Sequence, residues 1–156
     1  MASSRVDDAV TALATGRVII VDDGTSAELV VAATYATTAT TAFMVRHGSG
    51  FVSVALPPET CERLRLPPMH WQSDVRVTVD LVGTGTGISA EARAATIAAL
   101  GAPESQATDF VRPGHVVPHS THLGGVLEHA RHAEAHRPHP PRRAARGRRV
   151  QRTRVA

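Results

Sequence analysis

The 156-residue sequence contains no lysine, so all 17 of its basic residues are arginine. Aromatic residues make up only 3% of the chain, which argues against RNA recognition through stacked aromatic side chains. A single cysteine, Cys61, excludes an intramolecular disulfide framework. The uncharged run 29–45 is interrupted by five threonines and does not qualify as a membrane span. With no leader sequence recognisable at its start, we expect a cytoplasmic protein without a membrane partner.

The charge is unevenly distributed along the chain. Residues 1–135 carry 9 arginines and 14 acidic residues, whereas residues 136–156 carry 8 arginines and no acid. Apolar residues make up 42% of the sequence, enough for one domain with a core of Val, Ala, Leu and Ile. The sequence therefore predicts a domain at 1–135 followed by an Arg/Pro-rich, disordered tail at 136–156. Tail arginines can contact nucleic-acid phosphates, but no base-reading element accompanies them, so a nucleic-acid partner is not expected.

Hydrophobic periodicity predicts an irregular alternation of strands and helices. Ser89 is a suitable N-cap for one helix, and Gly101 is a suitable stop for it. Five threonines weaken the helical interpretation of the segment that follows the first strand. Helices are predicted at 6–16, 29–46, 57–64, 90–100 and 125–135, and strands at 17–21, 51–56, 75–81 and 116–117.

Short polar segments at the strand ends hold the residues best suited to chemistry. They are Asp22, Asp23, Glu28, Thr84, Thr86, Arg112 and His115. Carboxylates, imidazoles and guanidinium groups together suit an anionic, oxygen-rich substrate. Each motif also has a plain structural interpretation. The sequence Asp22-Asp23-Gly24 is more often a turn than a metal site, and GTGTG at 83–87 lacks the lysine of a phosphate-binding P-loop.

Seven of the nine histidines lie between His115 and His139. Such clustering can indicate zinc, but the region is polar and has no paired cysteines, which favours solvated histidines. His129 and His132 are spaced i, i+3 and can share one face of a helix. This pair is the best local candidate for a metal site.

Six stretches, taken in order, resemble the 3,4-dihydroxy-2-butanone 4-phosphate synthase family, the lyases of riboflavin biosynthesis. They are VDDAVTALATGRVIIVDD at 6–23, FMVRHGSGFVSVALP at 43–57, RLRLPPMH at 63–70, RVTVDLVGTGTGISAEARAATIAAL at 76–100, DFVRPGHVVP at 109–118 and GGVLEHARHAEA at 124–135. The resemblance covers nearly all of residues 6–135, and RPGHVVP and TGISA are distinctive in combination.

The resemblance implies an α/β fold of the α+β type, a single-domain mixed-sheet sandwich with helices that is truncated at its C-terminus. It implies conversion of D-ribulose 5-phosphate to L-3,4-dihydroxy-2-butanone 4-phosphate and formate by a homodimer that uses Mg²⁺ or Mn²⁺. Carried over position by position, it predicts catalytic roles for Asp23, Glu28 and His115, substrate binding by Thr86, Arg112 and Glu134, and metal binding by His132.

The sequence also departs from the family pattern at the site. The acidic loop after Asp23 is short, and the metal-binding Glu of the family has no counterpart. Ser53 stands where the family usually has Cys, and His129 replaces a phosphate-binding Arg. The chain leaves the pattern at His136, before the family's later strands. Two interpretations follow: a synthase with impaired activity, or a non-catalytic pseudoenzyme acting as a dimer partner or a sugar-phosphate binder.

Overall fold

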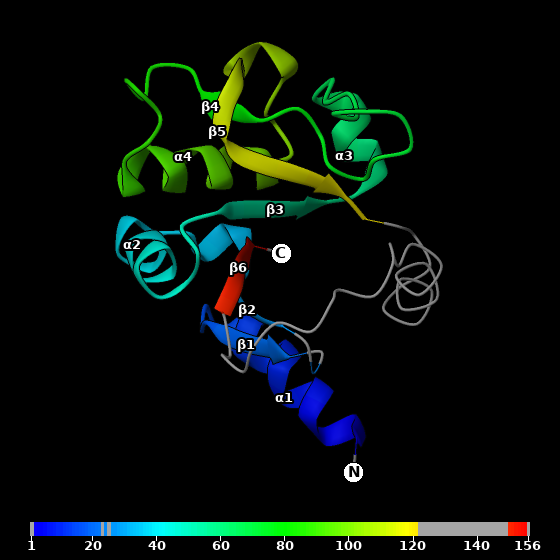
Figure 1. Cartoon of the computed structure of the whole chain (residues 1–156), viewed down its shortest axis with the longest axis vertical. Helices are drawn as coiled ribbons and strands as arrows, with labels where there is room; N and C mark the ends of the chain where they lie inside the picture. Colours follow the sequence, from blue (N-terminus) through cyan, green and yellow to red (C-terminus); the bar gives the residue numbers. More distant parts are fainter. Residues whose placement is uncertain (1, 23, 25, 122–149, 156) are drawn as a thin grey trace, which may run out of the picture.

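One mixed sheet organises the molecule, with helices packed on it (Figure 1). The computed structural model describes residues 2–22, 24, 26–121 and 150–155. Within that part of the chain the sheet has six strands in the order β1-β2-β6-β3-β5-β4. The strands are β1 (Ile19–Asp22), β2 (Ala27–Val31), β3 (Val52–Leu56), β4 (Val79–Leu81), β5 (Phe110–Ser120) and β6 (Val150–Val155).

The four inner strands run parallel and the two edge strands run antiparallel to their neighbours. In the inner part, Ser53 of β3 lies opposite Val117 of β5. Parallel strands are usually buried on both faces and read as apolar runs. The segments VSVAL in β3 and AELVV in β2 fit this rule, since most of their side chains are buried.

Two capped helices pack on each other and on the inner strands (Figure 1). The side chain of Thr37 caps α2 by accepting the N–H of Thr40, and Ser89 caps α4 by accepting the N–H of Ala92. The helices are α1 (Ala2–Ala14), α2 (Thr38–His47), α3 (Pro58–Arg63) and α4 (Ala90–Gly101), with 3₁₀ turns η1 (Ala33–Tyr35) and η2 (Ala107–Asp109). Among the described residues, no helix has both the length and the apolar character needed to cross a bilayer.

Aliphatic side chains form most of the core between these helices and the sheet. The fully buried ones include Val31, Val52, Val54, Val79, Ile97, Leu64, Leu100 and Val116. Each contributes about 1.5–3 kcal/mol by its removal from water. Phe110 is the single aromatic residue among the buried core positions of the described chain. The expectation of a core made mainly of aliphatic residues is confirmed.

Several predicted elements are confirmed with small shifts of their ends. The helix predicted at 90–100 is α4, the helix predicted at 57–64 is α3, and the strand predicted at 51–56 is β3. The helix and strand predicted at 6–16 and 17–21 are α1 and β1. The strand predicted at 75–81 is shorter, and the one predicted at 116–117 is part of the 11-residue strand β5.

The prediction of one helix over 29–46 is wrong. Residues 29–31 belong to β2, a 3₁₀ turn follows at Ala33–Tyr35, and only Thr38–His47 is helical. Three consecutive buried side chains, Leu29, Val30 and Val31, are typical of a strand buried on both faces and break helical periodicity. The N-cap at Thr37 marks where the helix begins.

The expectation of a disordered tail at 136–156 is wrong for its last part. Val150–Val155 forms β6, which pairs in parallel with β2 on one side and β3 on the other. This strand therefore joins the two halves of the sheet. The segment VQRTRV shows no apolar–polar alternation, so local periodicity does not identify it as a strand. The remainder of the tail, and the helix predicted at 125–135, lie outside the described residues.

Candidate functional site

The candidate site centres on a buried carboxylate on β4 and an imidazole on β5. Nδ1 of His115 lies 2.7 Å from Oδ2 of Asp80, and the backbone N–H of His115 donates to Oδ1 of Asp80 at 2.9 Å. The Asp80 side chain is 8% exposed, whereas the His115 side chain is 40% exposed. His115 thus donates a hydrogen bond to each carboxylate oxygen of the buried Asp80, while part of the His115 ring stays exposed to solvent.

Two glycines leave room for Asp80, one for its carboxylate and the other for the backbone just before it. Gly87 adopts φ +74, and a Cβ atom at this position would overlap the carboxylate of Asp80. Gly114 precedes His115, and a Cβ atom there would overlap the backbone of Val79. The N–H of Gly114 donates to Oγ1 of Thr78 at 3.0 Å. The GTGTG turn and the PGH segment are therefore required by the packing around Asp80.

Two threonine side chains, one on α4 and one in the turn after β4, bond to the backbone of β4. Oγ1 of Thr96 on α4 accepts the N–H of Leu81 at 3.0 Å and donates to the carbonyl of Ala92 at 2.9 Å. Oγ1 of Thr84 donates to the carbonyl of Leu81 at 2.7 Å. Since Leu81 directly follows Asp80, these bonds hold the carboxylate at a fixed distance from His115.

This arrangement is suited to proton transfer. A carboxylate accepts hydrogen bonds only, so Nδ1 of His115 carries the proton that faces Asp80. That tautomer leaves Nε2 able to take up a proton from a substrate, and Asp80 stabilises the imidazolium that forms. The pair can therefore act as a general base and return the proton as a general acid.

Within the described part of the chain, the side chain of Arg112 donates three hydrogen bonds, and all three go to backbone carbonyls. One terminal nitrogen donates to the carbonyls of Ala107 and Phe110, and the other donates to the carbonyl of Leu64 at 2.8 Å. The guanidinium thus ties the segment before β5 to the end of α3. Thr86, the other described residue predicted to bind substrate, is exposed in the turn between β4 and α4.

The predicted acidic residues lie toward the other edge of the sheet. Glu28 is on β2, opposite Val21, and β6 and β3 separate β2 from the strand of His115. At about 4.8 Å between neighbouring strands, that separation is about 14 Å, so one chain does not bring Glu28 and His115 together. Oδ1 of Asp22 accepts the N–H of Gly24 at 2.8 Å and forms a tight turn there.

Three of the predicted site residues lie outside the described part of the chain. They are His132, predicted to bind metal, Glu134, predicted to bind substrate, and Asp23, predicted to be catalytic. Within the described residues, no group of three or more His, Cys, Asp or Glu side chains lies close enough together to hold a metal ion. The described donors alone therefore do not form a metal site.

Asp80 is the functional residue that sequence reasoning missed. It occupies a polar position in the alternating segment VRVTVDL, where the pattern predicts a side chain facing solvent. The available signal is an acidic residue three positions before the glycine-rich segment that begins at Gly83. Its burial depends on Gly87 and Gly114, which are distant in sequence from one another and meet only in the fold.

Comparisons with known proteins agree with this architecture. The family model of 3,4-dihydroxy-2-butanone 4-phosphate synthase matches residues 7–137. The riboflavin biosynthesis protein RibBA of Rhodococcus erythropolis is 45% identical over 141 residues, which cover 83% of this chain and 33% of that protein. This chain thus spans about a third of the length of that curated relative.

Two crystal structures show the same fold. The 3,4-dihydroxy-2-butanone 4-phosphate synthase of Candida albicans superposes with a TM-score of 0.75 at 38% identity and covers 83% of this chain and 69% of that one. A synthase of the same name in complex with two magnesium ions gives 0.76 at 38% identity, over 83% of this chain and 66% of that one. The chain belongs to the 3,4-dihydroxy-2-butanone 4-phosphate synthase family.

Proposed function

We propose that this chain converts D-ribulose 5-phosphate to L-3,4-dihydroxy-2-butanone 4-phosphate and formate in the cytoplasm. The observation that carries this proposal is the Asp80–His115 pair, with Nδ1 and Oδ2 2.7 Å apart. Rearrangement of a ketose phosphate begins with removal of a proton from a carbon beside the carbonyl. A half-exposed imidazole backed by a buried carboxylate supplies the base for that step.

In this mechanism His115 takes the proton at Nε2 and an enediol forms on the sugar. Asp80 stays ionised and holds the imidazolium in place through the Nδ1–H bond. His115 then returns the proton to a later intermediate. The second bond, from the His115 backbone N–H to Asp80, prevents the ring and the acid from separating during the cycle.

We further propose that the reaction depends on Mg²⁺ or Mn²⁺. A magnesium complex of a synthase with 38% identity supports this proposal. A divalent ion would polarise the carbonyl and hydroxyl oxygens of the sugar. His132 and Glu28 are the residues we expect to contribute to holding it, and the steps assigned to Asp80 and His115 do not depend on their geometry.

A second copy of the chain is part of the proposal. Glu28 and His115 lie on strands separated by two others, so a substrate that touches both groups needs them from different protomers. Three exposed apolar side chains on the His115 side of the sheet, Val82, Ile88 and Val111, offer a surface that a second copy bringing its Glu28 to this site would cover.

A non-catalytic role is the second candidate function. It is favoured by the short turn at Asp22, whose carboxylate is occupied by the N–H of Gly24 at 2.8 Å. In this alternative the chain binds sugar phosphate, or pairs with an active synthase, without turnover.

Formate release from D-ribulose 5-phosphate distinguishes the two candidates. The full chain is purified, its fold is checked by circular dichroism, and formate is measured by NMR with Mg²⁺ and with a chelator. The proposed activity predicts formate that requires the metal and is lost in His115→Gln. A folded chain that releases no formate overturns the proposal and leaves the binding role. Equal turnover in His115→Gln would instead remove His115 from the mechanism.

A further inference from the structure

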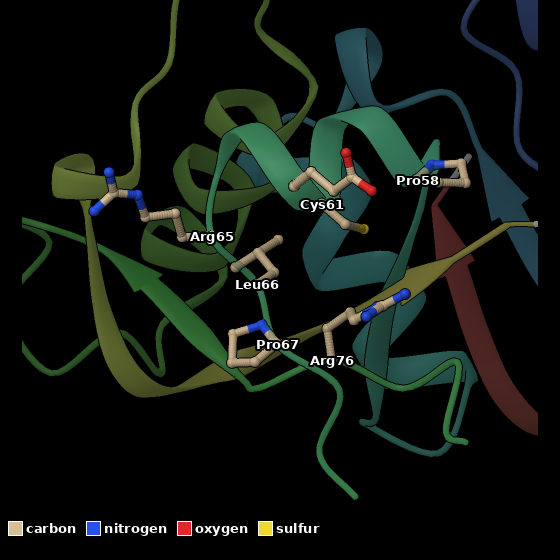
Figure 2. Close-up of a pocket in the computed structure, with 7 residues that line it drawn as sticks. Pro58, Cys61, Arg65, Leu66, Pro67 and Arg76 are labelled. Atoms are coloured by element: carbon tan, nitrogen blue, oxygen red, sulfur yellow. The ribbon is translucent and has the colours of Figure 1, made fainter. Parts of the chain in front are cut away.

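A cavity of about 500 Å³ lies beside α3, away from the Asp80–His115 pair (Figure 2). Its lining consists of Pro58, Cys61, Glu62, Arg65, Leu66, Pro67 and Arg76. This volume falls in the range of pockets that bind small molecules. The wall combines a flat apolar part, formed by prolines and a leucine, with charged side chains, so the cavity suits a ligand that has both characters.

The cavity is separated from the candidate active site along β5. Arg76 pairs by its backbone N–H with the carbonyl of Pro118, and Ser120 is the last residue of β5. His115 lies three positions before Pro118, which corresponds to about 10 Å along a strand. A small ligand in the cavity therefore does not touch the Asp80–His115 pair.

The guanidinium of Arg76 has an unsatisfied donor at the wall of the cavity. Its Nε atom is buried and makes no hydrogen bond to any residue that the structure describes. The buried Nε atoms of Arg93 and Arg112 are also unpaired, but these two guanidinium groups donate to backbone carbonyls through their terminal nitrogens. The guanidinium of Arg76 interacts with the Cys61 thiol, a weak hydrogen-bond acceptor (Figure 2). A buried N–H donor without an acceptor, such as this Nε atom, is costly unless a ligand supplies one.

The backbone at the end of α3 shapes the cavity. The N–H of Leu66 donates to the carbonyl of Cys61 at 2.8 Å, and the N–H of Arg65 donates to the carbonyl of Glu62 at 3.0 Å. This pair of bonds is a Schellman motif, with Arg65 at φ 51 in the position that usually holds glycine. The tight end turns the chain back so that Leu66 and Pro67 face the same space as Arg76 (Figure 2).

We propose that this cavity binds a small organic anion, with its phosphate or carboxylate on Arg76 and its apolar body against Leu66 and Pro67. Arg76 offers the planar donor set that matches such oxygens. Two arginines and one glutamate line the cavity, so its formal charge also favours an anion. The site is a second binding site, and it is independent of the proposed lyase activity.

The test uses NMR titration of the ¹⁵N-labelled full chain with phenyl phosphate, phenol and inorganic phosphate. Phenyl phosphate combines both features of the expected ligand, and each of the other two probes has one. We expect phenyl phosphate to shift the amide signals of Leu66 and Arg76 and to bind at least about tenfold more tightly than either other probe. These signals separate the cavity from the sugar-phosphate site, whose occupation shifts the signal of His115.

The matched variants are Arg76→Gln and Arg46→Gln. Both remove one positive charge, and Arg46 is exposed on α2, outside the cavity. Arg76→Gln is expected to weaken phenyl phosphate binding by about tenfold or more, with little change in Arg46→Gln. Absence of shifts at Leu66 and Arg76, equal binding of phenol, or equal affinity in both variants overturns the proposal. If Arg76→Gln fails to fold, the three probes on the unmodified chain still decide it. This titration does not measure formate release. It therefore tests the cavity even if the chain proves to have no lyase activity.

Discussion

Asp80 binds His115 at two points, accepting the backbone N–H at one carboxylate oxygen and the ring Nδ1–H at the other. Because both bonds go to one buried side chain, the ring orientation is coupled to the backbone of β5. A change at Asp80 therefore affects both the charge beside the imidazole and its position. This coupling allows electrostatic and steric contributions to be separated by substitution.

The substitution Asp80→Asn tests the charge. The amide oxygen can still accept one hydrogen bond, but the negative charge that stabilises the imidazolium is lost. If the chain is an active lyase, we expect formate formation to fall by about 10²-fold or more, since a positioned acid–base group contributes about that much. Initial rates of formate release at saturating D-ribulose 5-phosphate are the measurement.

Glu104→Gln is the matched control for this charge removal. Glu104 is exposed in the segment between α4 and η2, so its neutralisation should leave the rate unchanged. A fall in rate of similar size in both variants would indicate a general charge effect and contradict the role assigned to Asp80.

Substitution of two glycines in one turn tests the space around Asp80. Gly85 and Gly87 both have positive φ, at +66 and +74, so alanine is strained at either position. Only at Gly87 does a Cβ atom overlap the carboxylate of Asp80; at Gly85 nothing lies within 4 Å. We expect Gly85→Ala to cost about 1 kcal/mol of unfolding free energy and Gly87→Ala about 1–3 kcal/mol more.

Urea unfolding measures both glycine variants, and the formate assay shows whether the pair is displaced. Gly87→Ala should lose activity even under conditions where it stays folded, whereas Gly85→Ala should retain it. Equal stability of the two variants would mean that Asp80 moves freely and that the turn does not position it.

Local sequence signals are sufficient to predict helices whose ends are marked by capping or terminating residues. Ser89 and Gly101 bound α4, and Pro58 opens α3, so these helices were identified with small shifts. The segment after Leu29 contains no capping residue before Thr37. Its continuous uncharged sequence therefore does not reveal the boundaries between a strand, a 3₁₀ turn and a helix. Strand β6 escaped prediction because its partners, β2 and β3, are more than 90 residues away in the sequence.

The candidate site was predicted only in part for a related reason. His115 was identified from its motif, and the structure places it on β5 beside a buried acid. Asp80 was not, because a polar residue in an alternating strand is expected to face solvent. Arg112 was expected to bind substrate, yet three of its hydrogen bonds go to backbone carbonyls. From sequence alone, an arginine whose guanidinium bonds to backbone carbonyls cannot be distinguished from one whose guanidinium binds a substrate phosphate.

Two buried threonines should respond in opposite directions to replacement by valine. Oγ1 of Thr96 accepts the N–H of Leu81 and donates to Ala92, so Thr96→Val leaves a backbone donor unpaired. We expect a loss of about 1–3 kcal/mol of unfolding free energy. Oγ1 of Thr41 is buried and has no hydrogen-bond partner among the described residues, so Thr41→Val should be neutral or stabilising. Thermal and urea unfolding measure both. Similar losses in the two variants would show that the Thr96 hydroxyl does not hold β4.

Alkylation of Cys61 provides a test of burial at the cavity wall, because the chain has no other cysteine. Burial raises the pKa of this thiol, while the Arg76 guanidinium and the Ser120 hydroxyl oppose the rise. The thiolate is the reactive form, so a raised pKa leaves less of it at any given pH. We therefore expect slower reaction with iodoacetamide in the folded chain than in urea at pH 8. The folded-state rate should also continue to rise at pH values where the unfolded thiol has already levelled off. Mass spectrometry of the whole chain follows the single addition.

Coincident pH profiles of the alkylation rate in the folded and unfolded states would contradict a raised pKa. The variant Arg76→Gln should move the folded-state profile to still higher pH, because it removes a cation that stabilises the thiolate.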